Sequence, residues 1–186
     1  MQSQDSGPSM HLHVFSEEPN LPVLIPRVCA RHEDLGAVVC GNEPRHDALF
    51  LFPPQCPRLA VWADEQADEC DAAWLREQTS RRVLLVIDAS WSNRVAEGRI
   101  YRYQVARDSF SALAYSPELI STDSVRTVGC ECIDNLPQAM MHAGAMLAIV
   151  GSLCDFSRSI EESSLNAAML HLGVESLAAA KTISLA

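Results

Sequence analysis

The residues best suited to bind a ligand come directly after an apolar run at residues 83–87. This run stops at Asp88, Ser90 and Trp91, which offer a carboxylate, a small hydrogen-bonding group and an aromatic stacking face close together. Such a combination suits a binding or catalytic site. A second interpretation stays open, because a strand-terminal Asp or Ser often caps the next helix and Trp is often a core residue.

Residues 83–87 are expected to form the strand that positions these side chains. An unbroken run of β-branched residues and leucine is typical of a strand that is buried on both faces. In an open α/β sheet, ligands bind beyond the carboxyl ends of such strands. We therefore expect Asp88, Ser90 and Trp91 to lie at the edge of a mainly parallel sheet.

Short strands and helices alternate along the rest of the chain, which predicts an α/β fold. Further strands are expected at residues 11–15, 37–40, 48–52 and 99–105. A short helix or strand is expected at 109–115, and a strand or strand-to-helix junction at 125–132. Helices are expected at residues 64–77, 137–154, 160–172 and 174–183. The three prolines of residues 19–26 favour an extended connection, and residues 116–123 read as a polar loop.

Length and composition favour one domain. The chain has 186 residues, of which 48% are hydrophobic, and a mean hydropathy of +0.02. It can therefore bury a sizeable core in a single domain, expected at residues 10–186 after a disordered N-terminus at residues 1–9. The apolar stretch 139–153 contains His142 and is shorter than a bilayer span, so we expect a core helix there and no membrane partner.

Seven cysteines form an odd set without a repeated C-x-x-C pattern. Neither a disulfide framework nor a zinc knuckle is therefore expected, and buried thiols in a reducing compartment fit the pattern better. The first residues lack the cationic start and apolar stretch of a signal peptide. We accordingly expect a cytoplasmic protein.

The net charge of −10 argues against a whole-surface nucleic-acid binder, and no DNA partner is expected. Residues 1–80 carry 5 Arg against 13 acidic residues, whereas residues 81–107 carry 6 Arg against Asp88 and Glu97. This stretch is either a basic stripe around the Asp-x-Ser-Trp motif or a solvated hairpin with local ion pairs. Its arginines are Arg81, Arg82, Arg94, Arg99, Arg102 and Arg107.

The order of motifs resembles one superfamily. Asp88-Ala-Ser-Trp91 is followed by Ala114-Tyr-Ser-Pro117, by Arg126-Thr-Val-Gly-Cys-Glu131 and by an apolar segment with His142-Ala-Gly144. This order is similar to that of the TDD superfamily, which joins the DTW-domain transfer-RNA enzymes to the ribosomal-RNA aminocarboxypropyltransferases. Upstream segments also resemble it, namely His11-Leu-His-Val-Phe15, Asp47-Ala-Leu-Phe-Leu-Phe-Pro53 and Ala63-Asp64. Among these motifs only Asp-x-Ser-Trp is specific.

The resemblance implies a SPOUT-like α/β fold with a C-terminal trefoil knot and S-adenosylmethionine as donor. It further implies transfer of the 3-amino-3-carboxypropyl group to a uridine-type nitrogen of structured RNA, either transfer RNA or ribosomal RNA, with methylthioadenosine as the leaving group. The enzyme would hold donor and nucleophile in line, exclude water and remove a proton.

The same resemblance assigns roles to individual residues. Trp91 would pack against the donor, Asp88 would orient or deprotonate the base, and Ser90 would fix the strand end. Other residues would contact the donor or the RNA phosphates. The adenosine pocket would be lined near Phe52, Val86 and Gly129, with Glu131 supporting a helix start, and Arg94, Arg99 and Arg102 would meet the phosphates.

Several positions depart from the family pattern. The early Cys-Thr-Gly-Lys-Lys-Leu type segment has no match in residues 21–35, Ser116 replaces an Asn, and Thr127-Val128 replaces Leu-Ser. Lys181 is the only lysine. These departures leave open a diverged, non-catalytic interaction module, which could use residues 160–186 as an oligomer face. The oligomeric state, the RNA substrate and the role of Asp88 as cap or base stay open.

A caspase-like cysteine peptidase is a further alternative, with Cys130 as nucleophile. It would need a histidine on the preceding strands, and none lies between His46 and His142. We expect His142 to be a core residue of an apolar helix. The Cys130-Glu-Cys132 pattern has little support as a metal site, because no His or Cys cluster accompanies it.

Overall fold

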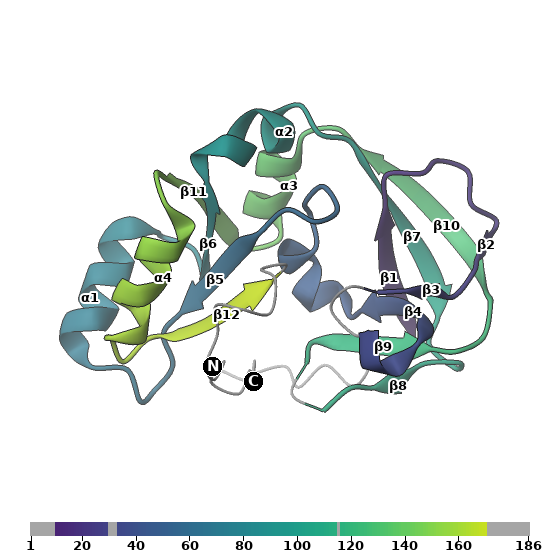
Figure 1. Cartoon of the computed structure of the whole chain (residues 1–186), viewed down its shortest axis with the longest axis horizontal. Coiled ribbons are helices and arrows are strands. Elements are labelled where there is room, and N and C mark those ends of the chain that lie inside the picture. The colour runs from purple at the N-terminus through teal and green to yellow at the C-terminus, as the bar shows by residue number, and fades with distance from the viewer. Residues whose placement is uncertain (1–9, 30–32, 115, 171–186) are drawn as a thin grey trace, which may run out of the picture.

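The chain folds into a large and a small β-sheet that lie side by side (Figure 1). The computed structural model describes residues 10–29, 33–114 and 116–170. Helices α1 (Glu69–Gln78) and α4 (Leu153–Glu161) cover the outer face of the small sheet. Helix α3 (Leu136–His142) and the 3-10 segment η2 (Pro44–Leu49) contribute to the core on the opposite face of that sheet.

The large sheet has the strand order β2-β10-β7-β1-β4-β9-β8, with β3 paired to β4, and every neighbouring pair is antiparallel. Its strands are β1 (His11–Ser16), β2 (Val23–Leu24), β3 (Arg27–Val28), β4 (Ala37–Asn42), β7 (Ile100–Ala106), β8 (Ser111–Ala112), β9 (Glu118–Ser121) and β10 (Val125–Ile133). The strand β1 therefore lies between β7 and β4, near the middle of the sheet.

The small sheet has the order β11-β6-β5-β12, and only β11 and β6 run parallel. Its strands are β5 (Arg58–Trp62), β6 (Val83–Asp88), β11 (Ala145–Val150) and β12 (Asn166–Leu170). The prediction of a mainly parallel, SPOUT-like sheet is therefore wrong. Strand β6 is buried on both faces as expected, but layers on both sides of a largely antiparallel sheet produce the same apolar run.

Two segments expected to be helical contain strands. Residues 137–154 contain all of α3 except its first residue, then β11, and then the start of α4. Gly144, with a φ of 84°, separates α3 from β11. Residues 160–172 contain the end of α4 and strand β12. The expected helix at residues 174–183 and the expected disorder at residues 1–9 lie outside the described residues, as does part of the region expected to form a knot.

Other elements follow the sequence more closely. The strands expected at residues 11–15, 37–40 and 99–105 are confirmed as β1, β4 and β7, and residues 125–132 lie in strand β10. Residues 48–52, expected as a strand, instead contain the end of η2, which has Pro44 in its first turn. The remaining elements are η1 (Glu33–Leu35), η3 (Ala89–Trp91) and α2 (Ser92–Ala96), and strand β9 lies within the expected polar loop 116–123.

Strand β6 divides its side chains between two hydrophobic clusters, as its period of two requires. Leu85 and Ile87 belong to the cluster that includes residues of η2 and α3, whereas Leu84 and Val86 pack beneath α1 and α4. A third cluster, which includes Leu12, covers the opposite face of the large sheet. We call the cluster that contains Leu85 and Ile87 the inner cluster. It includes residues of both sheets and of η2, and it thereby fixes the position of η2 against the large sheet.

None of the helices within the described residues is long and apolar enough to cross a membrane.

Candidate functional site

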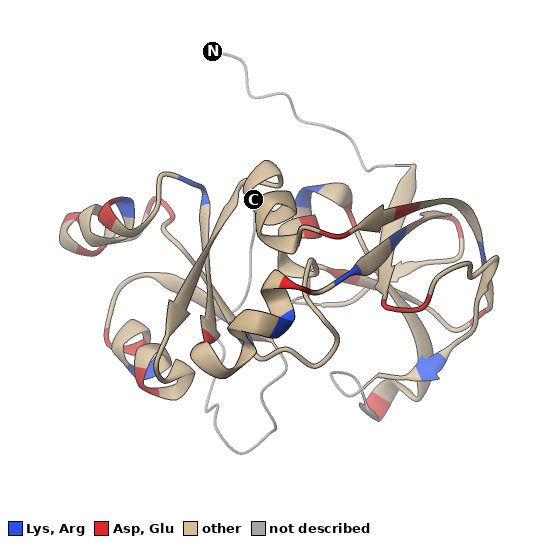
Figure 2. Cartoon of the chain, turned by 90° about the horizontal axis from the view of Figure 1, so that it is seen from above, with Lys and Arg blue, Asp and Glu red and all other residues tan. Residues whose placement is uncertain are grey.

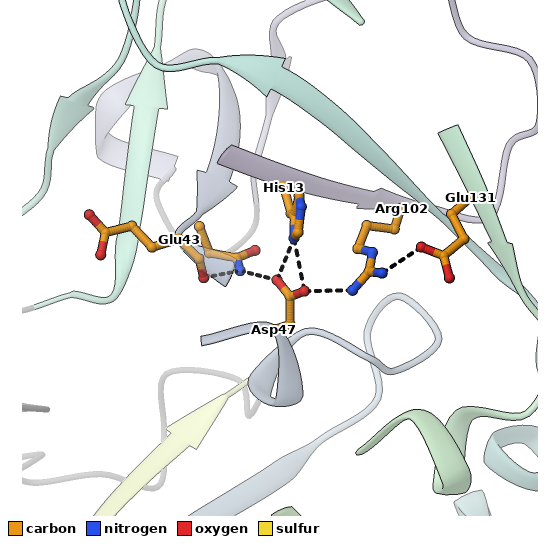
Figure 3. A network of polar contacts seen from close by, with 6 residues as sticks. His13, Glu43, Asp47, Arg102 and Glu131 are labelled. Carbon is orange, nitrogen blue, oxygen red and sulfur yellow. Dashed lines mark hydrogen bonds and ion pairs between the residues drawn. The ribbon is translucent and has the colours of Figure 1, made fainter. Parts of the chain in front are cut away.

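The carboxylate of Asp47 is the centre of a polar network between η2 and the large sheet (Figure 3). Its side chain is 5% exposed. Nδ1 of His13 lies 2.9 and 2.8 Å from the two carboxylate oxygens, and Nδ2 of Asn42 donates to Oδ1 at 2.9 Å. Arg102 donates to Oδ2 at 2.8 Å. These donors compensate a buried carboxylate for its lost hydration.

The register of the large sheet brings the donors together. His13 of β1 lies opposite Asn42 of β4 and Gln104 of β7. Residues two apart on a strand share a face, so Arg102 lies on the same face as Gln104. Glu131 of β10 lies opposite Arg102 and continues the row. Four neighbouring strands thus present polar side chains toward η2.

Arg102 connects the buried carboxylate to an exposed one. It bonds Asp47 with one terminal nitrogen and Glu131 with the other, and Glu131 is 59% exposed. Burial lowers the pKa of Arg102, but the hydrogen bonds to Glu131 and Asp47 outweigh it and hold the pKa above its ordinary value. Arg102 therefore stays a cation at the floor of the site.

A cleft of about 540 Å³ opens beside this network. Its size is in the range of small-molecule sites. Polar lining residues include His13, Asp47, Arg102, Glu131, Asn135, Gln138 and His142. A second space of about 330 Å³ shares His13, Arg102 and Glu131 with the cleft and adds Gln104, Gly129 and Cys130. The two spaces therefore meet at the His13–Arg102–Glu131 row.

His13 is the residue of this row that can exchange a proton with a bound molecule. Its side chain is 15% exposed and lines both spaces. Because Nδ1 faces the carboxylate of Asp47, the neutral ring carries its proton on Nδ1 and leaves a lone pair on Nε2. Within the described chain Nε2 has no hydrogen-bond partner. Nε2 is therefore available as a base.

The structure brings three of the residues expected to contact the donor or the RNA into this site, namely Arg102, Gly129 and Glu131. Asp88 and Ser90 lie elsewhere, at the end of β6, and neither lines the cleft. Oδ1 of Asp88 accepts from the backbone nitrogen of Ser90 at 3.0 Å and from its hydroxyl at 2.7 Å. These two bonds lower the pKa of Asp88, which caps η3. Its predicted role as a base stays a prediction.

The other residues of the expected donor pocket lie on separate elements. Trp91 packs against the inner cluster, with the guanidinium of Arg94 at 5.0 Å from its ring. Phe52 is buried under the guanidinium of Arg58, at 4.7 Å. Val86 is fully buried in the centre of β6. None of these three apolar residues lines the cleft at His13.

The arginines of residues 81–107 are distributed over several elements and do not form a single stripe. Figure 2 shows basic residues on both halves of the molecule, among acidic ones. Arg94 pairs with Glu17 at 3.7 Å, Arg107 pairs with Glu43 at 2.6 Å, and Arg102 points into the cleft. Arg99 is exposed just before β7. The acidic partners of Arg94, Arg102 and Arg107 lie far from them in sequence, so these pairs are not those of a single local hairpin, and RNA binding stays a prediction.

The expectation that His142 is a core residue is wrong. Its position also bears on the alternative of a cysteine peptidase. The predicted core histidine is exposed at the end of α3 and lines the cleft. Cys130 is exposed on β10 and lines the neighbouring space, to which His142 does not contribute.

The described residues contain no cluster of three or more His, Cys, Asp or Glu that could hold a metal ion.

His13, Asn42, Asp47 and Gln104 were not identified as site residues from the sequence. One signal was available for two of them. His13 interrupts the apolar residues of β1, and Asp47 directly precedes the apolar run 48–52, where an unpaired charge would be costly. A polar residue on an otherwise buried segment indicates either a partner or a function.

The residues of the cleft all lie in the part of the sequence that matches the model of a protein family. No curated protein and no solved structure matches the chain. The model of DUF6886, a family of unknown function, matches residues 12–174. The chain therefore belongs to the family of unknown function DUF6886.

Proposed function

We propose that the protein is a hydrolase or group transferase that acts on a small polar molecule and uses His13 for acid–base catalysis. The observation that carries this proposal is the geometry of the His13–Asp47 pair. A buried carboxylate holds Nδ1 at 2.8 Å, and Nε2 is left for a ligand in a cleft of about 540 Å³. Such a pair can accept a proton and release it again during one turnover.

In the proposed reaction His13 accepts a proton and returns it, so no other group has to supply or remove one. Nε2 of His13 takes the proton of a water or hydroxyl nucleophile, whose oxygen forms a bond to the carbon or phosphorus of an ester. The bond to the leaving oxygen breaks, and that oxygen takes the proton back from Nε2. Asp47 stabilises the imidazolium that forms in between, by the same logic as the carboxylate of a serine-protease triad.

Arg102 and Glu131 complete this arrangement. Two of the five N–H groups of Arg102 bond Asp47 and Glu131, and the described residues supply no partner for the other three. These donors can stabilise negative charge that develops on the substrate. Glu131 is the more exposed carboxylate, so a substrate anion can displace it from Arg102 at smaller cost than it can displace Asp47.

The proposal is tested by turnover of a defined panel, namely p-nitrophenyl acetate, p-nitrophenyl phosphate, bis(p-nitrophenyl) phosphate and nucleoside phosphates. We expect at least one ester to be cleaved, and His13→Gln to slow this reaction by about 1,000-fold or more. His11→Gln is the matched control on the same strand and should retain turnover. Cleavage by His13→Gln at the rate of the control would overturn the proposal.

Transfer of an aminocarboxypropyl group from S-adenosylmethionine to RNA stays a separate proposal, implied by the family resemblance. Gly129 and Glu131 are its only expected donor-pocket residues beside the cleft. Calorimetry with S-adenosylmethionine tests this proposal, with Trp91→Ala measured beside the wild type. Saturable binding that the variant loses would support the proposal, and no binding at millimolar donor would exclude it.

We also infer a cytoplasmic location, because all seven cysteines are free thiols.

A further inference from the structure

A small pocket lined by Arg45, His46 and Arg82 lies next to the cleft. Its volume is about 110 Å³, below the range of whole small-molecule sites but sufficient for one chemical group. Ala143, at the end of α3, lines both the pocket and the cleft. Arg45 and His46 directly precede Asp47 on η2. A molecule in the cleft could therefore extend one group into this pocket, which we call the Arg82 pocket.

His46 carries an unsatisfied ring in the Arg82 pocket. Both of its nitrogens are buried and have no hydrogen-bond partner among the described residues, where they are the only such side-chain atoms. Native proteins rarely leave a buried polar atom without a partner, because its lost hydration is then not replaced. The exception indicates a group that binds a ligand.

The charges around His46 specify the sign of that ligand. Two guanidinium groups, Arg45 and Arg82, contribute to the pocket, and no Asp or Glu lines it. Burial lowers the pKa of His46, and Arg45 and Arg82 lower it further, against opposing effects of Glu43 and Asp47. Arg45 uses Nε for its 2.8 Å contact with Glu43, which leaves its terminal nitrogens without a partner in the described chain. The pocket is thus suited to an anion.

We propose that the Arg82 pocket binds the phosphate group of a phosphorylated small molecule whose reacting bond lies at His13. The proposal rests on the function proposed above and narrows its substrate to phosphate esters. Three side chains that carry N–H donors line the pocket, and a phosphate monoester presents three terminal oxygens, whereas a carboxylate presents two. The His46 ring would supply one neutral N–H donor and the arginines would neutralise the charge.

Side-chain NMR of the histidines tests the binding step. Wild-type protein is titrated with ribose 5-phosphate, inorganic phosphate and ribose while the ring resonances of His46 and His142 are followed. We expect ribose 5-phosphate to shift both residues and ribose to shift neither. Ribose 5-phosphate should also bind more tightly than inorganic phosphate, because the ester reaches the cleft. Equal affinities, or no shift at His46, would overturn the proposal.

Variants locate the anion and separate the two proposals. Arg82→Gln should weaken binding of ribose 5-phosphate at least 10-fold, and Arg45→Gln should weaken it in the same direction. Arg81→Gln, an exposed neighbour outside the pocket, should bind as the wild type does, and equal loss in this control would overturn the assignment. Melting temperatures within a few degrees of the wild type establish that each variant is folded.

His13→Gln distinguishes a failed pocket from a failed function. If this variant binds ribose 5-phosphate normally while wild-type protein cleaves no ester, the pocket stands and the proposed function fails. If a phosphate ester is cleaved but Arg82→Gln leaves its KM unchanged, the proposed function stands and the pocket fails.

Discussion

Nδ1 of His13 faces both carboxylate oxygens of Asp47, at 2.9 and 2.8 Å, across 34 positions of sequence. His13 belongs to β1 of the large sheet and Asp47 to η2, so the contact joins two layers of the molecule. Because the carboxylate is held in turn by Asn42 and Arg102, it cannot turn away from the ring. The orientation of the imidazole is therefore set by buried bonds instead of by the substrate.

Asp47→Asn should change the tautomer of His13. The amide can present its N–H to Nδ1, which would move the ring proton to Nε2 and remove the base from the cleft. Loss of the corresponding carboxylate in a catalytic triad lowers turnover by about 10,000-fold, and we expect an effect of that order. Ring nitrogen shifts in ¹⁵N NMR report the tautomer directly. Asp123→Asn, an exposed control, should change neither quantity, and an unchanged tautomer in Asp47→Asn would contradict the positioning role.

Arg102→Lys should lose both stability and turnover. A lysine ammonium cannot reproduce the planar fork that reaches Asp47 and Glu131 at once. We expect a loss of about 1.5–3 kcal/mol in the free energy of unfolding, from the charge-assisted bond to Asp47, and about 100-fold in kcat. Urea denaturation and steady-state kinetics measure the two effects. The exposed Arg126→Lys serves as control, and wild-type kcat in Arg102→Lys would exclude Arg102 from charge stabilisation.

His46 should make the protein less stable in mild acid. Its folded-state pKa lies below the ordinary value of 6.5, mainly because of burial. Between that folded-state value and 6.5 the unfolded chain binds more protons than the folded one. The contribution of His46 to the free energy of unfolding therefore increases as the pH rises through this range and decreases as the pH falls. Urea denaturation at pH 7, 6 and 5 should give a flatter profile for His46→Asn than for the wild type. Parallel profiles would refute this contribution.

Tyr103→Phe should destabilise the large sheet without affecting the cleft. The buried hydroxyl donates to the carbonyl of Glu18 at 2.6 Å and accepts from the backbone nitrogen of Leu21 at 3.3 Å. Its removal leaves both backbone groups without this partner, at a cost of about 1–3 kcal/mol in the free energy of unfolding. Tyr101→Phe, on the same strand and face, should cost much less. Equal losses in the two variants would show that the hydroxyl bonds are not responsible.

The sequence located four of the eight strands of the large sheet, namely β1, β4, β7 and β10. In β1 and β7 the signal is the alternation of apolar residues. The sequence could not give the direction of the strands, since the run in β6 looks the same in a parallel sheet and in a covered antiparallel one. It also failed for residues 145–150, because a short apolar run without strict alternation fits a buried helix as well as a strand.

The candidate site was harder to predict than the strands. Gly129, Glu131 and Arg102 were named, but for contacts with a donor and with RNA. The pair of His13 and Asp47 has no periodicity in the sequence, because it arises from the register of β1 with its neighbours and from the packing of η2. The only sequence signal for the pair is the presence of a polar residue beside apolar ones, His13 within β1 and Asp47 before the run 48–52.

The Asp47 network also connects the large sheet to the segment that leads into the small sheet. Its donors belong to β1, β4 and β7 of the large sheet, whereas its acceptor lies on the segment that leads into the small sheet. A ligand that bridges these groups would strengthen the joint and add about 2.7 kcal/mol of stability at a concentration of 100 times its Kd. Resistance to heat should therefore report occupancy of the cleft, so that a melting screen of phosphorylated metabolites can identify a ligand before any reaction is known.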